Sequence, residues 1–122
     1  MALRPPLLIL GRNPENPFNG YLSEILTIEG YLCMEEYDSS ETPLTEEVLD
    51  GRPLVILSSV PLEDDEVEVL KSYVRGGGNL IASRPAPKLA EAFGIKPVKG
   101  YYNLAKDCYI IINHDDPLMV GF

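Results

Sequence analysis

The chain has 122 residues, of which 45% are hydrophobic, and this size and composition are typical of one globular domain spanning residues 1–122. Its 19 acidic and 10 basic residues give a formal net charge of -9 at pH 7, which argues against nucleic acid and anionic membranes as partners. No apolar segment has the length of a membrane span, and the first apolar run is too short for a signal-peptide core. We therefore expect a cytoplasmic protein.

The first half of the chain predicts two strands and two helices. Residues 7–10 form a short apolar run, and the loop that follows is rich in Asn, Pro and Gly. Asn16 and Pro17 are typical of an N-cap and a first helical position, which predicts a helix through Ile28 that Gly30 ends. Residues 31–37 predict a weaker second strand, and residues 45–49 predict a short acidic helix.

Residues 53–85 predict a strand, an amphipathic helix and a second strand. The run 54–57 is apolar throughout, as in a strand buried on both faces. Val67, Leu70 and Val74 then follow helical spacing, with carboxylates in the first turn that complement the helix dipole. Three glycines at 76–78 end this helix, and the run 80–82 begins the next strand. The pattern is typical of a βαβ unit.

The remaining residues predict one more helix and a fifth strand. Residues 88–93 predict one or two helical turns closed by Gly94, and residues 108–112 form the apolar run CYIII. Strands that alternate with helices in this way predict an α/β fold, a three-layer α/β/α sandwich around a mostly parallel five-stranded sheet. The expected strand order is 2-1-3-4-5, as in flavodoxin-like folds.

The two cysteines and the glycine run give no sign of a metal or a cofactor. Cys33 and Cys108 belong to no CxxC pair and to no zinc-ligand spacing, and their apolar neighbours predict buried free thiols. The glycines at 76–78 precede a strand, so they lack the helix N-terminus with which a glycine loop binds phosphate. We expect no cofactor and no metal.

A ligand of such a sheet binds beyond the carboxyl ends of the strands, near the point where the strand order reverses. The loops expected at this edge carry five candidate ligand-binding residues, Arg12, Asn13, Ser58, Ser59 and Arg84. Arg84 is the strongest of them, because a guanidinium beside a strand end can hold a carboxylate with two hydrogen bonds. A salt bridge of Arg84 to a loop acid, and turn formation by the Asn side chains, are the structural alternatives.

A catalytic alternative places a nucleophile at Ser83, in the turn that joins the fourth strand to the next helix. His114, the only histidine, would be its base, and Asp116 would orient that base. Such a turn is tight and needs small residues two positions to either side of the nucleophile. Ile81 and Pro85 occupy those positions, which argues against catalysis by Ser83.

The stretches NPFNGYLSEILTIEGY, PLVILSSVPLEDDEVEVLKSYVRGGGNLIASRP and KLAEAFGI resemble the class I glutamine amidotransferase-like superfamily. The resemblance is to its non-catalytic branch, with the trehalose-utilisation-type domains, the β-galactosidase trimerisation domain and the domains similar to the N,N-dimethylformamidase large subunit. It covers most of the chain to about Gly94, and HDDPLMVGF is similar to a segment found there.

This resemblance implies a domain that serves protein interaction, assembly or small-ligand binding. Active glutamine amidotransferases carry cysteine where this chain has Ser83, and a late His-x-Glu where it has His114-x-Asp116. The alternative is a hydrolase or amidase, or its accessory subunit, that uses Ser83 and His114. We also expect self-association, because the fifth strand at 108–112 would lie at a sheet edge with no charge or proline within its run from Tyr109 to Ile112.

Overall fold

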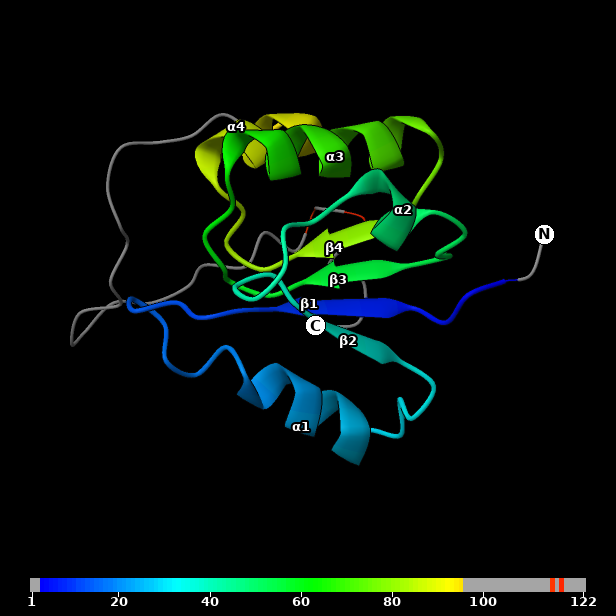
Figure 1. Cartoon of the computed structure of the whole chain (residues 1–122), viewed down its shortest axis with the longest axis vertical. Coiled ribbons are helices and arrows are strands. Elements are labelled where there is room, and N and C mark those ends of the chain that lie inside the picture. Colours follow the sequence, from blue (N-terminus) through cyan, green and yellow to red (C-terminus); the bar gives the residue numbers. More distant parts are fainter. Residues whose placement is uncertain (1–2, 96–114, 116, 118–122) are drawn as a thin grey trace.

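The structure, a computed structural model, describes residues 3–95, 115 and 117. Its four strands are β1 (Leu7–Leu10), β2 (Glu35–Asp38), β3 (Val55–Leu57) and β4 (Leu80–Ala82). They form one parallel sheet in the order β2-β1-β3-β4 (Figure 1). The α/β class, the parallel pairing and this part of the order are confirmed, and the predicted strand at 108–112 lies outside the described residues.

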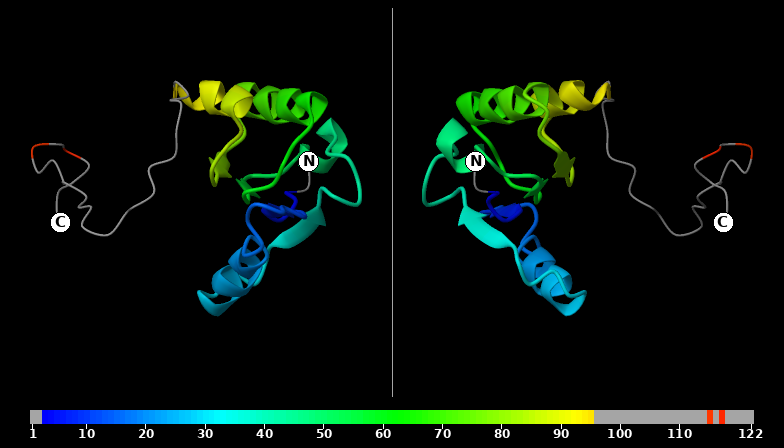
Figure 2. Two further views of the ribbon diagram at one scale, coloured as in Figure 1. Left: turned by 90° about the vertical axis from the view of Figure 1, so that its left-hand side faces the viewer. Right: turned by 90° about the vertical axis from the view of Figure 1, so that its right-hand side faces the viewer.

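Within residues 3–95, four α-helices and one 3₁₀ helix connect and follow these strands. They are α1 (Tyr21–Ile28), α2 (Glu46–Leu49), α3 (Asp64–Arg75), α4 (Pro87–Ala90) and η1 (Glu91–Phe93). Helices α3 and α4 lie together over the sheet, while α1 lies beside β2 at the opposite end of the molecule (Figures 1 and 2).

The hydrophobic core lies between one face of the sheet and helices α2, α3 and α4. Alternate residues of the strands point to this face, which is why Leu7, Ile9, Val55 and Leu57 are buried together. The helices contribute the other buried members, Leu49, Val67, Leu70 and Leu89, and the loop before α2 contributes Leu44. The sheet and the helical layer thus share one apolar interior.

Helix α3 begins and ends where its sequence predicts. Glu63 and Glu66 form a capping box, in which Glu63 N donates to Glu66 Oε2 at 2.9 Å. Glu66 Oε1 also accepts a hydrogen bond from Leu44 N at 2.9 Å, so this buried carboxylate joins the helix to the preceding loop. At the other end, Gly77 adopts a φ of 97°, which a residue with a β-carbon rarely adopts.

The loop before α1 differs from its sequence prediction. Asn16 is not the N-cap, because the helix begins only at Tyr21 and Gly20 precedes it. Asn16 Oδ1 instead accepts a hydrogen bond from Phe18 N at 3.3 Å, and Asn16 O accepts one from Asn19 N at 3.4 Å. Two prolines within four residues favour such successive turns over a continuous helix.

The second strand is shorter than predicted, and one cysteine prediction is wrong. Residues 31–34 belong to the connection that follows Gly30, whose φ is 95°, and β2 begins only at Glu35. Cys33 lies in this connection and is exposed, so its apolar neighbours are not a sign of burial. Cys108 lies outside the described residues.

Candidate functional site

The loops that follow β1 and β3 meet at the carboxyl edge of the sheet, as the strand order predicts. Asn13 Nδ2 donates a hydrogen bond to Ser59 O at 2.5 Å, and Asn13 Oδ1 accepts one from Glu15 N at 2.9 Å. Asn19 Nδ2 donates to Gly11 O at 2.6 Å and to Ser59 O at 3.4 Å. The amides of Asn13 and Asn19 therefore hold the two loops together. The hydrogen bond from Glu15 N to Asn13 Oδ1 is the kind of turn contact that the sequence left open as an alternative.

Ser58 places a buried hydroxyl at this junction. The residue is 2% exposed, and its backbone N donates to Ile9 O at 3.0 Å. Its Oγ has no hydrogen-bond partner among the residues that the structure describes. Burying a hydroxyl without a partner costs about 1–3 kcal/mol, so Ser58 Oγ retains an unused capacity to donate and accept at the junction of the two loops.

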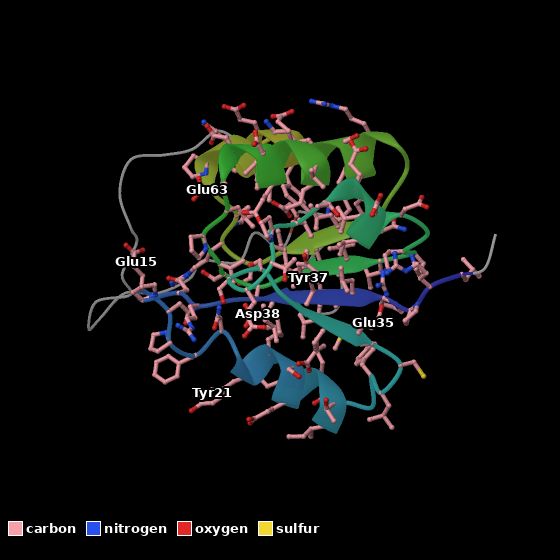
Figure 3. The ribbon with its side chains drawn as sticks, viewed as in Figure 1. Glu15, Tyr21, Glu35, Tyr37, Asp38 and Glu63 are labelled. Atoms are coloured by element: carbon pink, nitrogen blue, oxygen red, sulfur yellow. The ribbon has the colours of Figure 1, made fainter. Side chains whose placement is uncertain are left out.

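The end of β2 adds a carboxylate to the same edge. Ser40 Oγ donates to Asp38 Oδ1 at 2.5 Å and Ser40 N donates to it at 2.9 Å. These hydrogen bonds, and then the charge of Arg12, hold the pKa of Asp38 below its ordinary value. Arg12 is exposed, so its guanidinium also faces solvent. Asp38 and Ser40 were not singled out by the sequence, although both come within three residues of the predicted strand at 31–37. Figure 3 shows Asp38 at the end of β2.

The turn after β4 carries backbone strain at Arg84. Arg84 is the one residue other than glycine, within the described part of the chain, that has a positive φ, and this φ is 49°. That conformation costs a residue with a β-carbon about 1–2 kcal/mol. The Arg84 side chain is exposed and makes no hydrogen bond or ion pair with another described residue, so the alternative of a loop salt bridge is not seen there.

Ser83 lies just before this strained position, and its side chain is exposed. Its backbone N donates to Leu57 O at 2.9 Å, which continues the ladder between β3 and β4. The predicted partners of Ser83, His114 and Asp116, lie outside the described residues. Whether a base approaches Ser83 therefore stays a prediction.

Two surface hollows lie away from this edge. The larger, of about 620 Å³, lies between α2 and the glycines that end α3, and its acidic members are Glu46, Glu47 and Asp50. It adjoins the residues that precede β3 and β4, so it lies at the amino ends of these strands. The second, of about 430 Å³, is more apolar and lies along β4, with Leu54, Leu80 and Phe93 in its wall.

Within residues 3–95 no three His, Cys, Asp or Glu side chains gather as metal ligands would. None of the described helices is long and apolar enough to cross a bilayer.

No protein-family model matches the sequence, and comparisons with curated proteins and with solved structures gave no match either.

Proposed function

We propose that this chain is a non-catalytic glutamine amidotransferase-like domain that serves interaction, assembly or the binding of a small ligand. The observation that carries the proposal is Arg84, an exposed cation with a strained backbone in the turn after β4. Strained residues of this kind gather at binding and active sites, since the surrounding structure must maintain them against their conformational preference.

The identity of the strained residue supports a binding role over a catalytic one. A nucleophile elbow places a serine or cysteine at the strained position between a strand and a helix, where its side chain is exposed. Here that position holds Arg84, and Ser83 precedes it. An arginine cannot act as a nucleophile or a base at neutral pH, but it binds carboxylates and phosphates well.

The ligand that fits this edge best is a small molecule with a carboxylate or phosphate group. Arg84 and Arg12 supply two exposed cations from the turns that follow β4 and β1. Ser58 Oγ is a buried hydroxyl between these turns that has no hydrogen-bond partner among the described residues. Cations and a hydroxyl donor together match an anionic group. Two parallel N–H donors of one guanidinium would fix the orientation of that group.

The proposal includes the finer features of the fold. A fifth strand at residues 108–112 would pair with β4 and complete the order 2-1-3-4-5, with the helices in two layers around the sheet. The apolar hollow along β4 supports this arrangement, because a strand laid there would cover Leu80 and Phe93. Self-association would then involve this fifth strand, as the sequence predicts.

Binding is tested by titrating citrate and inorganic phosphate into the ¹⁵N-labelled protein and following the amide resonances. We expect shifts at Arg12, Ser58, Ser59 and Arg84, and a loss of about tenfold in affinity for Arg84→Gln. Arg75→Gln is the matched control, because Arg75 is an exposed arginine at the end of α3. Shifts confined to the opposite edge, or equal losses in both variants, would contradict the site.

Catalysis is tested separately with glutamine and with simple ester substrates. We expect no turnover above that of buffer for the wild type or for Ser83→Ala. Turnover that Ser83→Ala and His114→Ala both abolish would favour the hydrolase or amidase alternative and overturn the proposal.

A further inference from the structure

Helix α1 presents a stripe of large apolar side chains to solvent. Tyr21, Ile25 and Ile28 lie on one face at helical spacing, and their exposed fractions are 55%, 53% and 83%. Phe18 extends the stripe before the helix, and its ring centroid lies 5.8 Å from that of Tyr21. Tyr31 and Leu32, in the connection that follows the helix, are also exposed, with exposed fractions of 63% and 74%. We call these six residues the α1 stripe.

The α1 stripe is not the face with which the helix contacts the rest of the chain. That contact uses Leu22 and Leu26, which are half-buried, and the hydroxyl of Ser23, which donates to Glu36 of β2. No residue of α1 is fully buried. Tyr21 points away from the sheet, and the helix projects from the end of the molecule (Figures 2 and 3).

The size of the stripe matches a protein interface. A large side chain offers roughly 150–250 Å², so the exposed fractions leave on the order of 700 Å² of apolar surface on the stripe. The largest apolar patch of a typical monomer covers about 300–600 Å². A standard interface buries about 800 Å² on each partner, which is close to the area that the stripe offers.

The sequence segment that carries the stripe has charged residues of one sign only. Between Arg12 and Arg52 the sequence has ten Asp and Glu residues and no Lys, Arg or His. The rest of the chain has the other nine of its 19 acidic residues and all 10 basic ones, so the whole negative surplus belongs to this segment. Glu24 and Glu29 lie on α1 itself and are exposed.

We propose that the α1 stripe is the docking surface for a partner polypeptide that presents an amphipathic helix with an apolar face bordered by Lys and Arg. The apolar face would pack along Tyr21, Ile25 and Ile28 in the manner of helix-in-groove recognition. The basic borders would meet Glu24 and Glu29, which sets partner choice and speeds association. This extends the interaction role proposed above and shares no residue with the proposed anion site.

A second copy of the chain fits the stripe less well. A pair of α1 stripes in contact would bring together two segments that each carry ten acidic residues and no basic one. Like charges that come within the screening length of about 8 Å at physiological salt repel each other, and this repulsion opposes such a contact. The same surplus disfavours an anionic lipid surface, although the stripe is apolar.

The test uses a fluorescent 18-residue helical peptide of Leu and Lys, with the leucines on one face, and a matched peptide with Glu in place of Lys. Binding to the wild type is followed by anisotropy at low and high salt. We expect the Lys peptide to bind in the micromolar range, more weakly at high salt, and the Glu peptide to bind at least about tenfold more weakly.

Two variants distinguish peptide binding at the stripe from general charge attraction between the peptide and the protein. Ile28→Asp adds a negative charge, so attraction by charge alone would strengthen binding, whereas loss of the apolar contact weakens it. We expect Ile28→Asp to weaken binding by about tenfold or more. Leu3→Asp is the control, because Leu3 is 86% exposed and the charge change is the same, and we expect it to bind within about twofold of the wild type or more tightly.

Three results would overturn the proposal. The first is that the wild type does not bind the Lys peptide at about 100 µM, which is about ten times a Kd of about 10 µM. The second is that Ile28→Asp binds it as tightly as Leu3→Asp does. The third is a dimer of the wild type, seen by light scattering at tens of micromolar, that Ile28→Asp dissociates, since a second copy would then be the occupant.

Discussion

The ring of Tyr73 lies so close to the backbone of Gly78 that a β-carbon on Gly78 would overlap the ring atoms. The Tyr73 hydroxyl also lies 3.0 Å from Arg52 O and 3.3 Å from Asn79 O, and it donates a hydrogen bond toward these carbonyls. Arg52 precedes β3 and Asn79 precedes β4, so one side chain of α3 fixes the starts of two strands. Gly78 is therefore required for close packing rather than for a positive φ.

We predict that Gly78→Ala lowers the free energy of unfolding by about 1–3 kcal/mol, because the Tyr73 ring must move to admit the new methyl group. Urea denaturation measures this loss. The control is Gly76→Ala in the same glycine run, where the φ is -74° and the nearest atoms lie at 3.4 and 3.5 Å. That variant should be neutral or slightly more stable, and an equal loss in both variants would contradict the packing argument.

Burial raises the pKa of Tyr73 above its ordinary value of 10.0, since the fold favours the neutral phenol. The resulting stabilisation is complete below pH 10 and is lost as the pH rises through the higher pKa of the folded state. We predict that stability falls as the pH rises above 10, and that the stability of Tyr73→Phe falls less steeply over the same range. Urea midpoints at several pH values test this. Equal slopes for the two proteins would show that the phenol ionises alike in both states.

Glu66 is predicted to contribute more to stability than any exposed acid of α3. Glu66→Ala leaves Leu44 N and Glu63 N without their acceptor, so we expect a loss of about 2–3 kcal/mol in the free energy of unfolding. Glu68→Ala is the matched control on the same helix. It removes only an exposed ion pair with Lys71 at 3.0 Å, for which we expect about 0.5 kcal/mol or less. Similar losses for both would mean that the capping box contributes little.

Arg84→Gly tests whether the strained turn serves binding. Glycine adopts a φ of 49° without steric cost, so we expect the variant to gain up to about 1 kcal/mol in stability. The same change removes the guanidinium and should weaken citrate binding as Arg84→Gln does. If the variant is less stable than the wild type, the Arg84 side chain stabilises the turn. The positive φ at Arg84 would then not be a net cost to stability.

The elements with strong local signals were predicted well from the sequence. Helix α3 has apolar residues at helical spacing, acidic residues in its first turn and glycines after its end, which all favour the same structure, and it runs over Asp64–Arg75 as expected. Strand β4 begins two residues after the last of these glycines. The loop from Asn13 to Gly20 was predicted less well, because Asn and Pro are compatible both with a helix start and with successive turns, and local sequence does not decide between them.

The sequence did not predict which side chains are buried, or which residues form hydrogen bonds and ion pairs with one another. Arg52 reads as an ordinary surface cation, yet it is buried, donates to Pro5 O at 2.9 Å and forms an ion pair with Glu35. Cys33 and the α1 stripe have apolar sequences, yet they are exposed. At the carboxyl edge, the sequence indicated Asn13 and Ser59 as candidate residues. It did not predict the hydrogen bond between them, because this bond joins residues 46 positions apart.

The sequence by itself determined the α/β class and the parallel sheet, because the period of the apolar residues and the glycines act over a few neighbouring positions. Only the tertiary structure decided which polar groups are used and which are left free. Asn13 is engaged by a distant loop, Ser58 Oγ has no partner among the described residues, and Arg84 is strained and exposed. Such outcomes depend on contacts between residues far apart in the chain, and no local pattern encodes them.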